Sequence, residues 1–494
     1  MLLLASTLAG AMSGRAEEPH HCSGGVAMGN AVADGRAIVW RNMDWSPSRA
    51  WWLDVRKPGS GYETLMSGGQ GAGVNQRGLC YIYTSMSQMS PGYTEAGALP
   101  IHYLMDHCAT VAEVRQAIIE QINWVRSAGS NGVDHWVADG GVPAGSLHVC
   151  DAYGNATVFE LGRGEYYEYD PQNTNRLLQI PIQVAARAND PPQKRADHCE
   201  TGGVGGNRYS DATNNLLQMA TNGDPVTIRE MIDRVSRFGH PGFDNPIRNC
   251  HDTTQNGQIF WGARADEDPR TATFFSAAAN PDYSPYVPLW YLGIQNLSVR
   301  HRDTWTNGLS CLGTNLFSKR GADSTYDDYI NSFYVGMEDN FIEGVTLTRQ
   351  YWLQQKALGL PGFDTNTAKR VSDGAADAAW RTMTVMCKGS GRNLHVPPTL
   401  TSISITTTGD NSFTMDCAAS ASALDGSTIS SVSWDFGDGA TASGTPAPHT
   451  YGTNGTFLVQ CVVTDSLGAQ NIKWKLVTAP VVAAYRHGAF IMFD

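Results

Sequence analysis

The feature that most constrains this chain is a strand, turn, strand pattern near its start, over residues 20–45. Two short apolar runs flank Asp34 and Gly35. An Asp-Gly pair between two apolar runs predicts a β-hairpin, because such a pair tolerates the positive φ values that the tight turn needs. Cys22 stands at the start of the first run. The chain is therefore expected to build a sheet around a pair of strands that opens on a cysteine.

The residues ahead of Cys22 predict export. Residues 1–14 contain a short apolar run, and Gly14-Arg15-Ala16 after it provides a small-residue cleavage site. We expect a signal peptide over residues 1–16 and a short propeptide over residues 17–21, which makes Cys22 the first residue of the mature chain. No later segment reaches the roughly 18 consecutive apolar residues of a membrane span. The expected location is secreted or periplasmic.

A cysteine at the first position carries its own base. A thiol with an ordinary pKa of about 8.5 is mostly protonated near neutral pH, and a free α-amine, which titrates at about 7.7–8.0, can take its proton. On the facing strand, Arg41 offers a cation for the thiolate and Asp44 offers a carboxylate to position the amine. The two are three residues apart, so both reach one site only where the strand ends or bends. The pattern predicts nucleophilic catalysis by Cys22.

Composition argues against several other classes. The 35 basic and 47 acidic residues give a net charge of −12 without a block of either sign, so neither nucleic acid nor an anionic membrane is expected as a partner. Ten cysteines without a CxxC pair fit an exported protein with some disulfides and give no support to a zinc ribbon. The contiguous His20, His21 and Cys22 lack metal-ligand spacing. We expect neither a metal ion nor a cofactor.

Cys22, followed by a hairpin and by Arg41-Asn42-Met43-Asp44, resembles one group of enzymes. These are the N-terminal nucleophile (Ntn) cysteine hydrolases of the penicillin V acylase, bile salt hydrolase and acyl-coenzyme A:6-aminopenicillanic acid acyltransferase type. The resemblance implies an α+β fold with a four-layer αββα core over residues 22–390. It also implies a hydrolase or acyltransferase that cleaves a linear amide C–N bond of a small molecule through an acyl-enzyme on Cys22. Autoproteolysis would free Cys22, with removal of the propeptide by another protease as the alternative.

The same resemblance implies further site residues. The segment Gly73–Leu79 is similar to the family's G-x-N-x-x-G-L motif, and its Asn75 is either an oxyanion or substrate contact or a turn former. Where the family has a second Asn, this chain has Thr84 and Ser85, so the oxyanion hole is expected to use a backbone N–H or a hydroxyl. The remaining catalytic candidates are Asn207, as the oxyanion donor, and Arg248, as the late arginine, with Arg264 as its less well placed alternative.

Beyond the hairpin, strands alternate with helices. Thr110–Glu113 and Thr227–Glu230 are capping boxes that open helices, and Gly154-Asn155 predicts a hairpin turn. Residues 326–356 and 367–386 are amphipathic and predict two long helices that cover a sheet face. This order of elements is typical of an α+β core of two sheets with helices outside.

The composition changes near residue 396 to short strands rich in Ser and Thr. Trp434–Gly439, His449–Tyr451 and Val463–Asp465 resemble, in order and spacing, the polycystic kidney disease (PKD) module. The resemblance implies an immunoglobulin-like β-sandwich over residues 396–480, followed by a tail over residues 481–494. Such a module implies a cell-surface or polysaccharide contact and supplies no catalysis by itself.

Two pairs of residues in this module carry further expectations. Cys417 and Cys461 lie on strands that face each other across an immunoglobulin-like sandwich, so we predict a disulfide that contributes about 2–4 kcal/mol. Asp435 and Asp438 are expected to cap a turn, with a calcium site as the alternative.

Two other functions stay open. Ser284–Trp290 resembles a segment of secreted cysteine dipeptidases of the same superfamily. The second alternative is a non-catalytic cell-surface binding protein that uses the PKD module. The complete set of Cys22, Arg41 and Asp44 favours an enzyme, and the missing second Asn favours a binding protein. Aromatic residues near the motif predict either an apolar acyl pocket or ordinary core; they are Trp45, Trp51, Trp52, Tyr81 and Tyr83.

Overall fold

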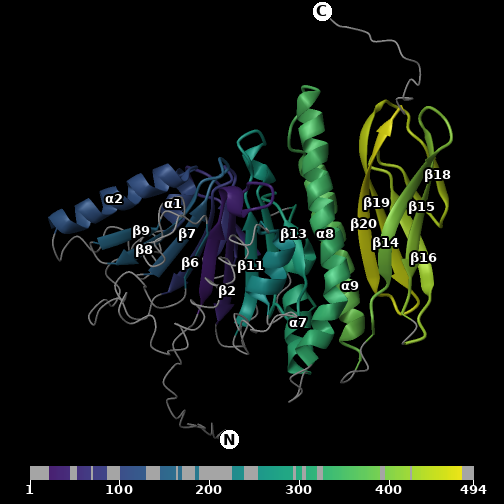
Figure 1. Cartoon of the computed structure of the whole chain (residues 1–494), viewed down its shortest axis with the longest axis horizontal. Coiled ribbons are helices and arrows are strands. Elements are labelled where there is room, and N and C mark those ends of the chain that lie inside the picture. The colour runs from purple at the N-terminus through teal and green to yellow at the C-terminus, as the bar shows by residue number, and fades with distance from the viewer. Residues whose placement is uncertain are drawn as a thin grey trace, which may run out of the picture.

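The structure is a computed structural model in which sheets and helices stack as layers along the long axis of the molecule (Figure 1). It describes residues 22–44, 53–67, 71–85, 101–128, 145–162, 165–169, 184–187, 225–237, 254–292, 296–302, 307–319, 326–389, 395–422 and 425–480. The mixed α+β character and the C-terminal sandwich that the sequence predicts are both present in these ranges.

The first sheet carries the N-terminal hairpin. Its described strands run in the order β10 (Val184–Arg187), β1 (Ser23–Ala27), β2 (Ile38–Asp44), β11 (Thr254–Trp261), β12 (Thr273–Ala277) and β13 (Tyr286–Leu289). β1 and β2 pair antiparallel, and Gly35 adopts a φ of 72° between them. The predicted hairpin is confirmed, although its connection also contains a short 3-10 helix (Gly29–Ala31) and is longer than a two-residue turn.

The second sheet lies against the first and is covered on its outer face by two helices (Figure 1). Its described strands follow chain order: β3 (Leu53–Arg56), β4 (Thr64–Ser67), β5 (Ala72–Asn75), β6 (Cys80–Ser85), β7 (Gly145–Cys150), β8 (Ala156–Gly162) and β9 (Glu165–Tyr169). The helices are α1 (Ile101–His107) and α2 (Val111–Ala128). The capping box of α2 is formed as predicted, since Glu113 N–H donates to Thr110 Oγ1 at 3.1 Å and Thr110 N–H donates to the Glu113 carboxylate at 3.0 Å.

An apolar core fills the space between the two sheets. Alternate residues of each strand point into it: on β6, Ile82 belongs to this core, whereas Tyr81 belongs to the core under α1. Val39 and Phe260 enter from the first sheet, and Val158 enters from the second. Each such buried side chain contributes roughly 1.5–3 kcal/mol. At the end of β1 where Cys22 lies, polar side chains replace the apolar ones.

Helices cover the other face of the first sheet (Figure 1). The long ones are α7 (Leu309–Ser318), α8 (Tyr326–Ala357) and α9 (Thr365–Met386), and the short ones are α5 (Ile228–Glu230), the π-helical turn η4 (Met231–Ser236) and α6 (Val299–Arg302). The two long helices predicted from the amphipathic pattern are confirmed, as is the capping box between Thr227 and Glu230. Within the described ranges, no helix combines the length and apolar character that crossing a membrane requires.

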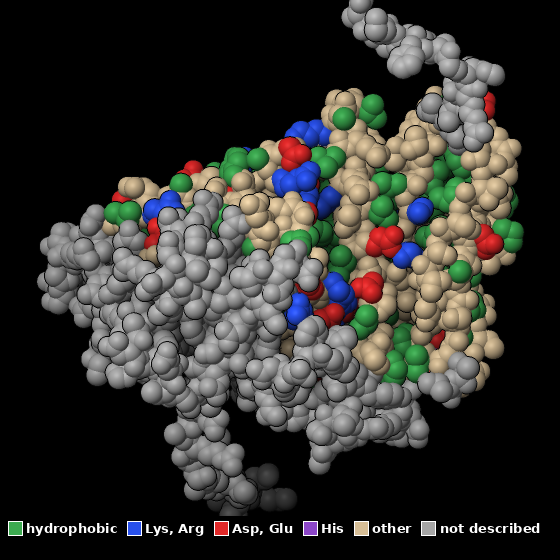
Figure 2. All heavy atoms as spheres, viewed as in Figure 1, with side chains coloured by type: hydrophobic (Ala, Val, Ile, Leu, Met, Phe, Trp, Pro, Cys, Tyr) green, Lys and Arg blue, Asp and Glu red, His purple; other side chains and the backbone are tan. Residues whose placement is uncertain are grey.

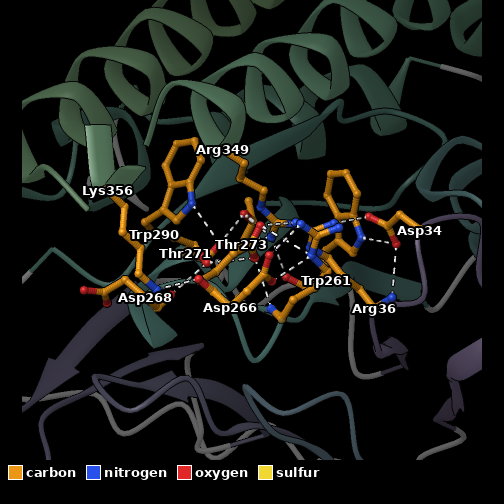
Figure 3. Close-up of polar contacts among 12 residues, drawn as sticks. Asp34, Arg36, Trp261, Asp266, Asp268, Thr271, Thr273, Trp290, Arg349 and Lys356 are labelled. Atoms are coloured by element: carbon orange, nitrogen blue, oxygen red, sulfur yellow. Dashed lines mark hydrogen bonds and ion pairs between the residues drawn. The ribbon is translucent and has the colours of Figure 1, made fainter. Parts of the chain in front are cut away.

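Arg349 of α8 anchors the helical layer to the loop between β11 and β12 (Figure 3). Its guanidinium donates to the Trp261 carbonyl at 2.8 Å, to the Thr271 carbonyl at 3.0 Å and to Thr273 Oγ1 at 2.8 Å. It also lies over the Trp261 ring, 4.2 Å from the centroid. Burial, together with the nearby charge of Arg36, lowers the pKa of Arg349 to about 9. This cluster lies at the end of β11 remote from Cys22 and has a structural role.

A buried ion-pair network ties α8 to η4 and β13. The Glu338 carboxylate accepts hydrogen bonds from Arg237 at 2.7 and 2.5 Å and from Arg229 at 3.0 Å. It also accepts the Tyr286 N–H at 2.8 Å. The neighbouring Ser236 makes two hydrogen bonds with the Asn42 side chain. Its carbonyl accepts from Asn42 Nδ2 and its Oγ donates to Asn42 Oδ1, each at 2.6 Å. The network therefore reaches the strand that carries Arg41.

The C-terminal sandwich has two sheets. One contains β14 (Thr399–Thr407), β15 (Ser412–Ser420) and β18 (Ala447–Thr450), and the other contains β17 (Thr441–Ser443), β16 (Ile429–Asp435), β19 (Gly455–Asp465) and β20 (Gln470–Ala479). Asp435 accepts the Gly437 N–H at 2.8 Å, and Asp438 accepts the Ala440 N–H at 3.0 Å. Both aspartates thus cap the turn, as predicted.

Cys417 and Cys461 meet inside this sandwich, but as thiols. The structure holds both as free cysteines, so it does not contain the predicted disulfide. The two side chains share a hydrogen bond, and burial raises the pKa of both thiols. The pairing of the two cysteines agrees with the sandwich topology, and the covalent bond stays a prediction.

The four-stranded sheet of the sandwich packs directly on α8 and α9. Trp474 and Ile472 of β20 belong to the same apolar core as the two helices. Gly344 of α8 makes room for the indole, because a Cβ there would lie 2.3 Å from the Trp474 ring. Figure 2 shows charged side chains of both signs along this junction, and one pair joins Arg370 to Asp435 at 2.9 Å. The sandwich is therefore a packed layer of the molecule.

We expect Trp474→Ala to destabilise the full chain by about 3–5 kcal/mol, because it empties a large buried volume at this junction. Chemical denaturation, monitored by the far-ultraviolet circular dichroism of the backbone, measures the change in unfolding free energy. Lys475→Ala, at the next and exposed position of β20, is the control and should stay within about 0.5 kcal/mol of wild type. Unchanged stability of Trp474→Ala would contradict a shared core.

Candidate active site

The candidate site lies at the open end of the β1–β2 pair. Opposite residues of antiparallel strands share a face, so Gly24, Arg41 and Gln258 form one row across β1, β2 and β11. Cys22 lies two residues before Gly24 and contacts Met43. This face of the first sheet looks toward the second sheet. The nucleophile candidate therefore lies at the polar end of the space between the sheets.

The Cys22 thiol and the Arg41 guanidinium meet directly. Nη2 of Arg41 donates to Sγ of Cys22 at 3.4 Å, and each residue is only 3% exposed. Nε and Nη1 of Arg41 have no hydrogen-bond partner among the described residues. A buried cation is costly without a counter-charge, and no described carboxylate pairs with this one. The Cys22 sulfur is thus the described side-chain group that this buried guanidinium contacts.

Asp44 is the last residue of β2, opposite Thr254. The register shifts between Thr254 and Asn256, which leaves Gln255 as an extra residue in a β-bulge. Bulges bend a strand and redirect its side chains. The extra residue belongs to β11, beside the end of β2 that carries Asp44. The Asp44 side chain lies outside what the structure describes, so its place beside Arg41 stays a prediction.

Thr84 lies at the end of β6 that faces this site. Its neighbour Tyr83 donates its N–H to the Gly71 carbonyl at 2.8 Å, and the Gly71 backbone lies against Arg41. The Thr84 side chain is fully buried, and its Oγ1 has no partner in the described part of the chain. Its predicted role as a hydroxyl donor to the oxyanion stays a prediction. Ser85 ends the strand, and its side chain is not described.

The hydrogen bonds of Asn75 favour its turn-forming alternative over a contact with oxyanion or substrate. Its Oδ1 accepts the N–H groups of Arg77 at 3.0 Å and Leu79 at 3.1 Å. Its Nδ2 donates to the carbonyls of Met105 at 2.9 Å and Cys108 at 2.8 Å. Because every amide group is engaged in holding the β5–β6 turn to α1, none is left for an oxyanion.

The remaining predicted residues are not brought to Cys22 by the described structure. Asn207 and Arg248 both lie outside the described residues. Arg264, the alternative to Arg248, follows β11 at the end remote from Cys22 and pairs with Asp266 at 3.1 Å. Its side chain is 39% exposed, so these contacts give no support to Arg264 as the late arginine.

Two buried amides on β11 belong to the site, although the sequence reasoning missed them. Gln258 lies opposite Arg41 and donates to Ser67 Oγ across the inter-sheet space. Asn256 lies opposite Met43 and makes a 3.9 Å contact from Nδ2 to its sulfur. Oε1 of Gln258 and Oδ1 of Asn256 have no described partner. The signal available in the sequence was the polar first half of this strand, which is buried along its whole length.

Tyr81 and Tyr83 serve the core rather than a pocket. Both belong to the apolar cluster under α1. Burial raises the pKa of Tyr83, the nearby Cys22 adds to the rise and Arg41 opposes it. The phenol therefore stays neutral near the thiol. Trp45, Trp51 and Trp52 lie outside the described residues. No group of three or more described His, Cys, Asp or Glu side chains is arranged to hold a metal ion.

Solved structures with a similar arrangement include a hydrolase. Two variants of the conjugated bile acid hydrolase from Clostridium perfringens match with 13% and 12% identity and TM-scores of 0.31 and 0.32. Each match covers 51% of this chain and 88% of the hydrolase chain. None of the curated proteins matches the chain.

The C-terminal sandwich has its own relatives. It is similar to the PKD1 domain of Epp from Vibrio anguillarum, with 25% identity, a TM-score of 0.16 and coverage of 17% of this chain and 95% of that one. It is also similar to the PKD1 domain of the metalloprotease PrtV from Vibrio cholerae, with 24% identity, a TM-score of 0.16 and coverage of 17% and 98%. The family model of the PKD domain matches residues 395–478. The chain therefore carries a PKD domain at its C-terminal end.

Proposed function

We propose that this chain is an exported amide hydrolase or acyltransferase of the Ntn type, with Cys22 as its first residue and nucleophile. The observation that carries the proposal is the buried contact between the Arg41 guanidinium and the Cys22 sulfur. A guanidinium removed from water is stabilised by a negative partner, and we assign that role to the Cys22 thiolate, which the 3.4 Å contact supports. The helix, sheet, sheet, helix order of layers agrees with the αββα core over residues 22–390 that the sequence resemblance implies.

In the proposed acylation step, the Cys22 α-amine takes the thiol proton and the sulfur attacks the amide carbonyl carbon. The C–S bond forms and the carbonyl oxygen becomes an oxyanion. We assign the Thr84 hydroxyl and the Asn207 amide as donors to that oxyanion. The C–N bond then breaks, the leaving amine takes the proton from the α-ammonium group, and a thioester remains on Cys22.

In the second step, water attacks the thioester with the α-amine as base, which releases a carboxylic acid and restores the thiol. An acceptor amine in place of water gives acyl transfer. Arg41 stabilises the sulfur charge both when the thiolate attacks and when it leaves. Asp44 holds the α-amine. Arg248 and Ser85 are proposed contacts of the substrate or oxyanion.

The acyl-enzyme itself is the test. The processed protein is incubated with N-acyl amino acids, β-lactams, bile-salt conjugates and dipeptides, and the peptide that begins at Cys22 is analysed by mass spectrometry after a rapid acid quench. We expect an acyl adduct on that peptide with at least one substrate class, and fast alkylation of Cys22 at neutral pH. Slow alkylation without any adduct would contradict the proposal and leave the PKD domain as the functional part.

Arg41→Ala and Asp44→Asn should each lower kcat/KM by about ten-fold to a thousand-fold without unfolding the protein, because each removes charge support from the nucleophile. Steady-state kinetics on the substrate found above measures the loss. Arg264→Ala is the matched control, since that arginine lies at the far end of β11, and it should keep wild-type turnover. Wild-type rates in both site variants would refute their assignment.

A further inference from the structure

Gly71 lies where no side chain fits. A Cβ at this position would be 1.9 Å from Nη1 of Arg41, 2.9 Å from its Cζ and 3.1 Å from its Nη2. These distances are far below van der Waals contact, so only a bare backbone allows the guanidinium to occupy its place. The φ of Gly71 lies outside the left-handed region. Space, rather than backbone conformation, requires glycine here.

The backbone at Gly71 is held in position by the second sheet. Its carbonyl accepts the Tyr83 N–H at 2.8 Å, and the next residue, Ala72, pairs with both Ser67 and Ile82. With neighbours on β4 and β6, this segment cannot move away from Arg41 without breaking ladder hydrogen bonds. The guanidinium, at the end of a flexible side chain, is the partner that would have to move.

We infer that Gly71 is a positioning residue, whose bare backbone forms the wall that aims Nη2 of Arg41 at the Cys22 sulfur. The inference rests on the proposed function, since it assigns how the cation of that site is oriented. The wall closes the space beside Nη1, and Nη2 of the same guanidinium contacts Sγ at 3.4 Å. A methyl group added to the wall displaces the cation while leaving both sheets paired.

The first test compares Gly71→Ala with wild type by the pH dependence of Cys22 alkylation and by steady-state kinetics. We expect the pH midpoint of alkylation to rise and kcat/KM to fall by about ten-fold or more, with little change in melting temperature. Gly73→Ala is the matched control from the same segment, because its Cβ would meet the Leu65 carbonyl and the Tyr81 ring, both at 2.8 Å, instead of Arg41. An equal midpoint shift in Gly73→Ala would overturn the inference.

The second test is a double-mutant cycle with Arg41→Lys, which has no Nη1 to collide with a Cβ at position 71. We expect Gly71→Ala to shift the alkylation midpoint in the wild-type background and to have no further effect in the Arg41→Lys background. A full effect in both backgrounds would overturn the role of Gly71. If Arg41→Ala alone leaves the alkylation profile unchanged, the Arg41–Cys22 pair of the proposed function fails, whatever Gly71 does.

Discussion

Replacing Cys22 by alanine is expected to lower amide turnover by roughly 10,000-fold or more, because the variant has no group to form the acyl-enzyme. The same replacement tests activation. If Cys22 cleaves the bond after His21, N-terminal sequencing finds Cys22 first in the wild-type protein and residues ahead of position 22 in the variant. That cleavage would be a unimolecular attack on the His21 carbonyl, favoured by proximity.

Cys108→Ala provides the control for this experiment. Cys108 is also buried, but it lies at the end of α1 against the core under that helix, and burial raises the pKa of its thiol to about 12. The control should retain turnover. A Cys22→Ala variant that matures normally shows that another protease removes the propeptide, whereas an active wild-type enzyme that retains His21 would falsify the N-terminal nucleophile mechanism.

Glu338→Gln should cost about 3–5 kcal/mol of folding free energy, because it leaves the buried Arg237 guanidinium without its close counter-charge and removes one of the carboxylates that Arg229 contacts. Arg237 is 3% exposed and Glu338 is fully buried. Burial alone would raise the pKa of Glu338, but the charges of Arg237 and Arg229 outweigh it, and the pKa is lowered from 4.5. This stabilisation is therefore full above the unfolded-state pKa and is lost as the pH falls through the lower folded-state pKa.

Denaturation at several pH values measures both parts of this prediction. Wild type should lose stability on acidification below about pH 4.5 more steeply than Glu338→Gln, which has no carboxylate to protonate. Asp339→Asn is the control, since its side chain is 54% exposed and lies 3.6 Å from Arg229, and it should change stability by less than about 1 kcal/mol. Equal losses of unfolding free energy in the two variants would contradict a larger contribution from the buried pair than from the exposed one.

The same variant tests the link between this network and the candidate site. Because Ser236, next to Arg237, donates a hydrogen bond to Asn42 of β2, Glu338→Gln should also slow alkylation of Cys22.

Much of the fold could be predicted from the sequence because its signals are local. The capping boxes at Thr110 and Thr227, the Gly154 turn and the hairpin around Gly35 each depend on residues close together in the chain. The two long helices follow from an apolar stripe with helical period. The PKD domain was recognisable because its turn and strand residues recur at a fixed spacing. The predicted disulfide between Cys417 and Cys461 depends instead on how two distant strands pack, and the structure holds both cysteines as thiols.

Some residues of the candidate site could likewise be proposed from sequence, whereas others depend on contacts that are distant in the chain. Cys22, Arg41 and Asp44 could be proposed from sequence because they lie on one hairpin. The contact between Cys22 and Arg41 agrees with that reasoning, and the place of the Asp44 side chain stays a prediction. Asn75 could not be decided from sequence, since its role depends on carbonyls of α1 that lie about thirty residues away. No sequence motif marks Gly71, Gln258 or Ser67 as part of the site.

The sequence by itself determined which elements form and which residues open the first hairpin, because helix caps, turns and hydrophobic periods act over a few residues. Only the tertiary structure decided where the Arg41 guanidinium points, since its surroundings come from β1, β11 and the segment before β5. It likewise decided that the C-terminal sandwich is packed on α8 and α9, with Trp474 seated on Gly344. Contacts of this kind depend on the stacking of whole layers, and no pattern along a single strand or helix specifies them.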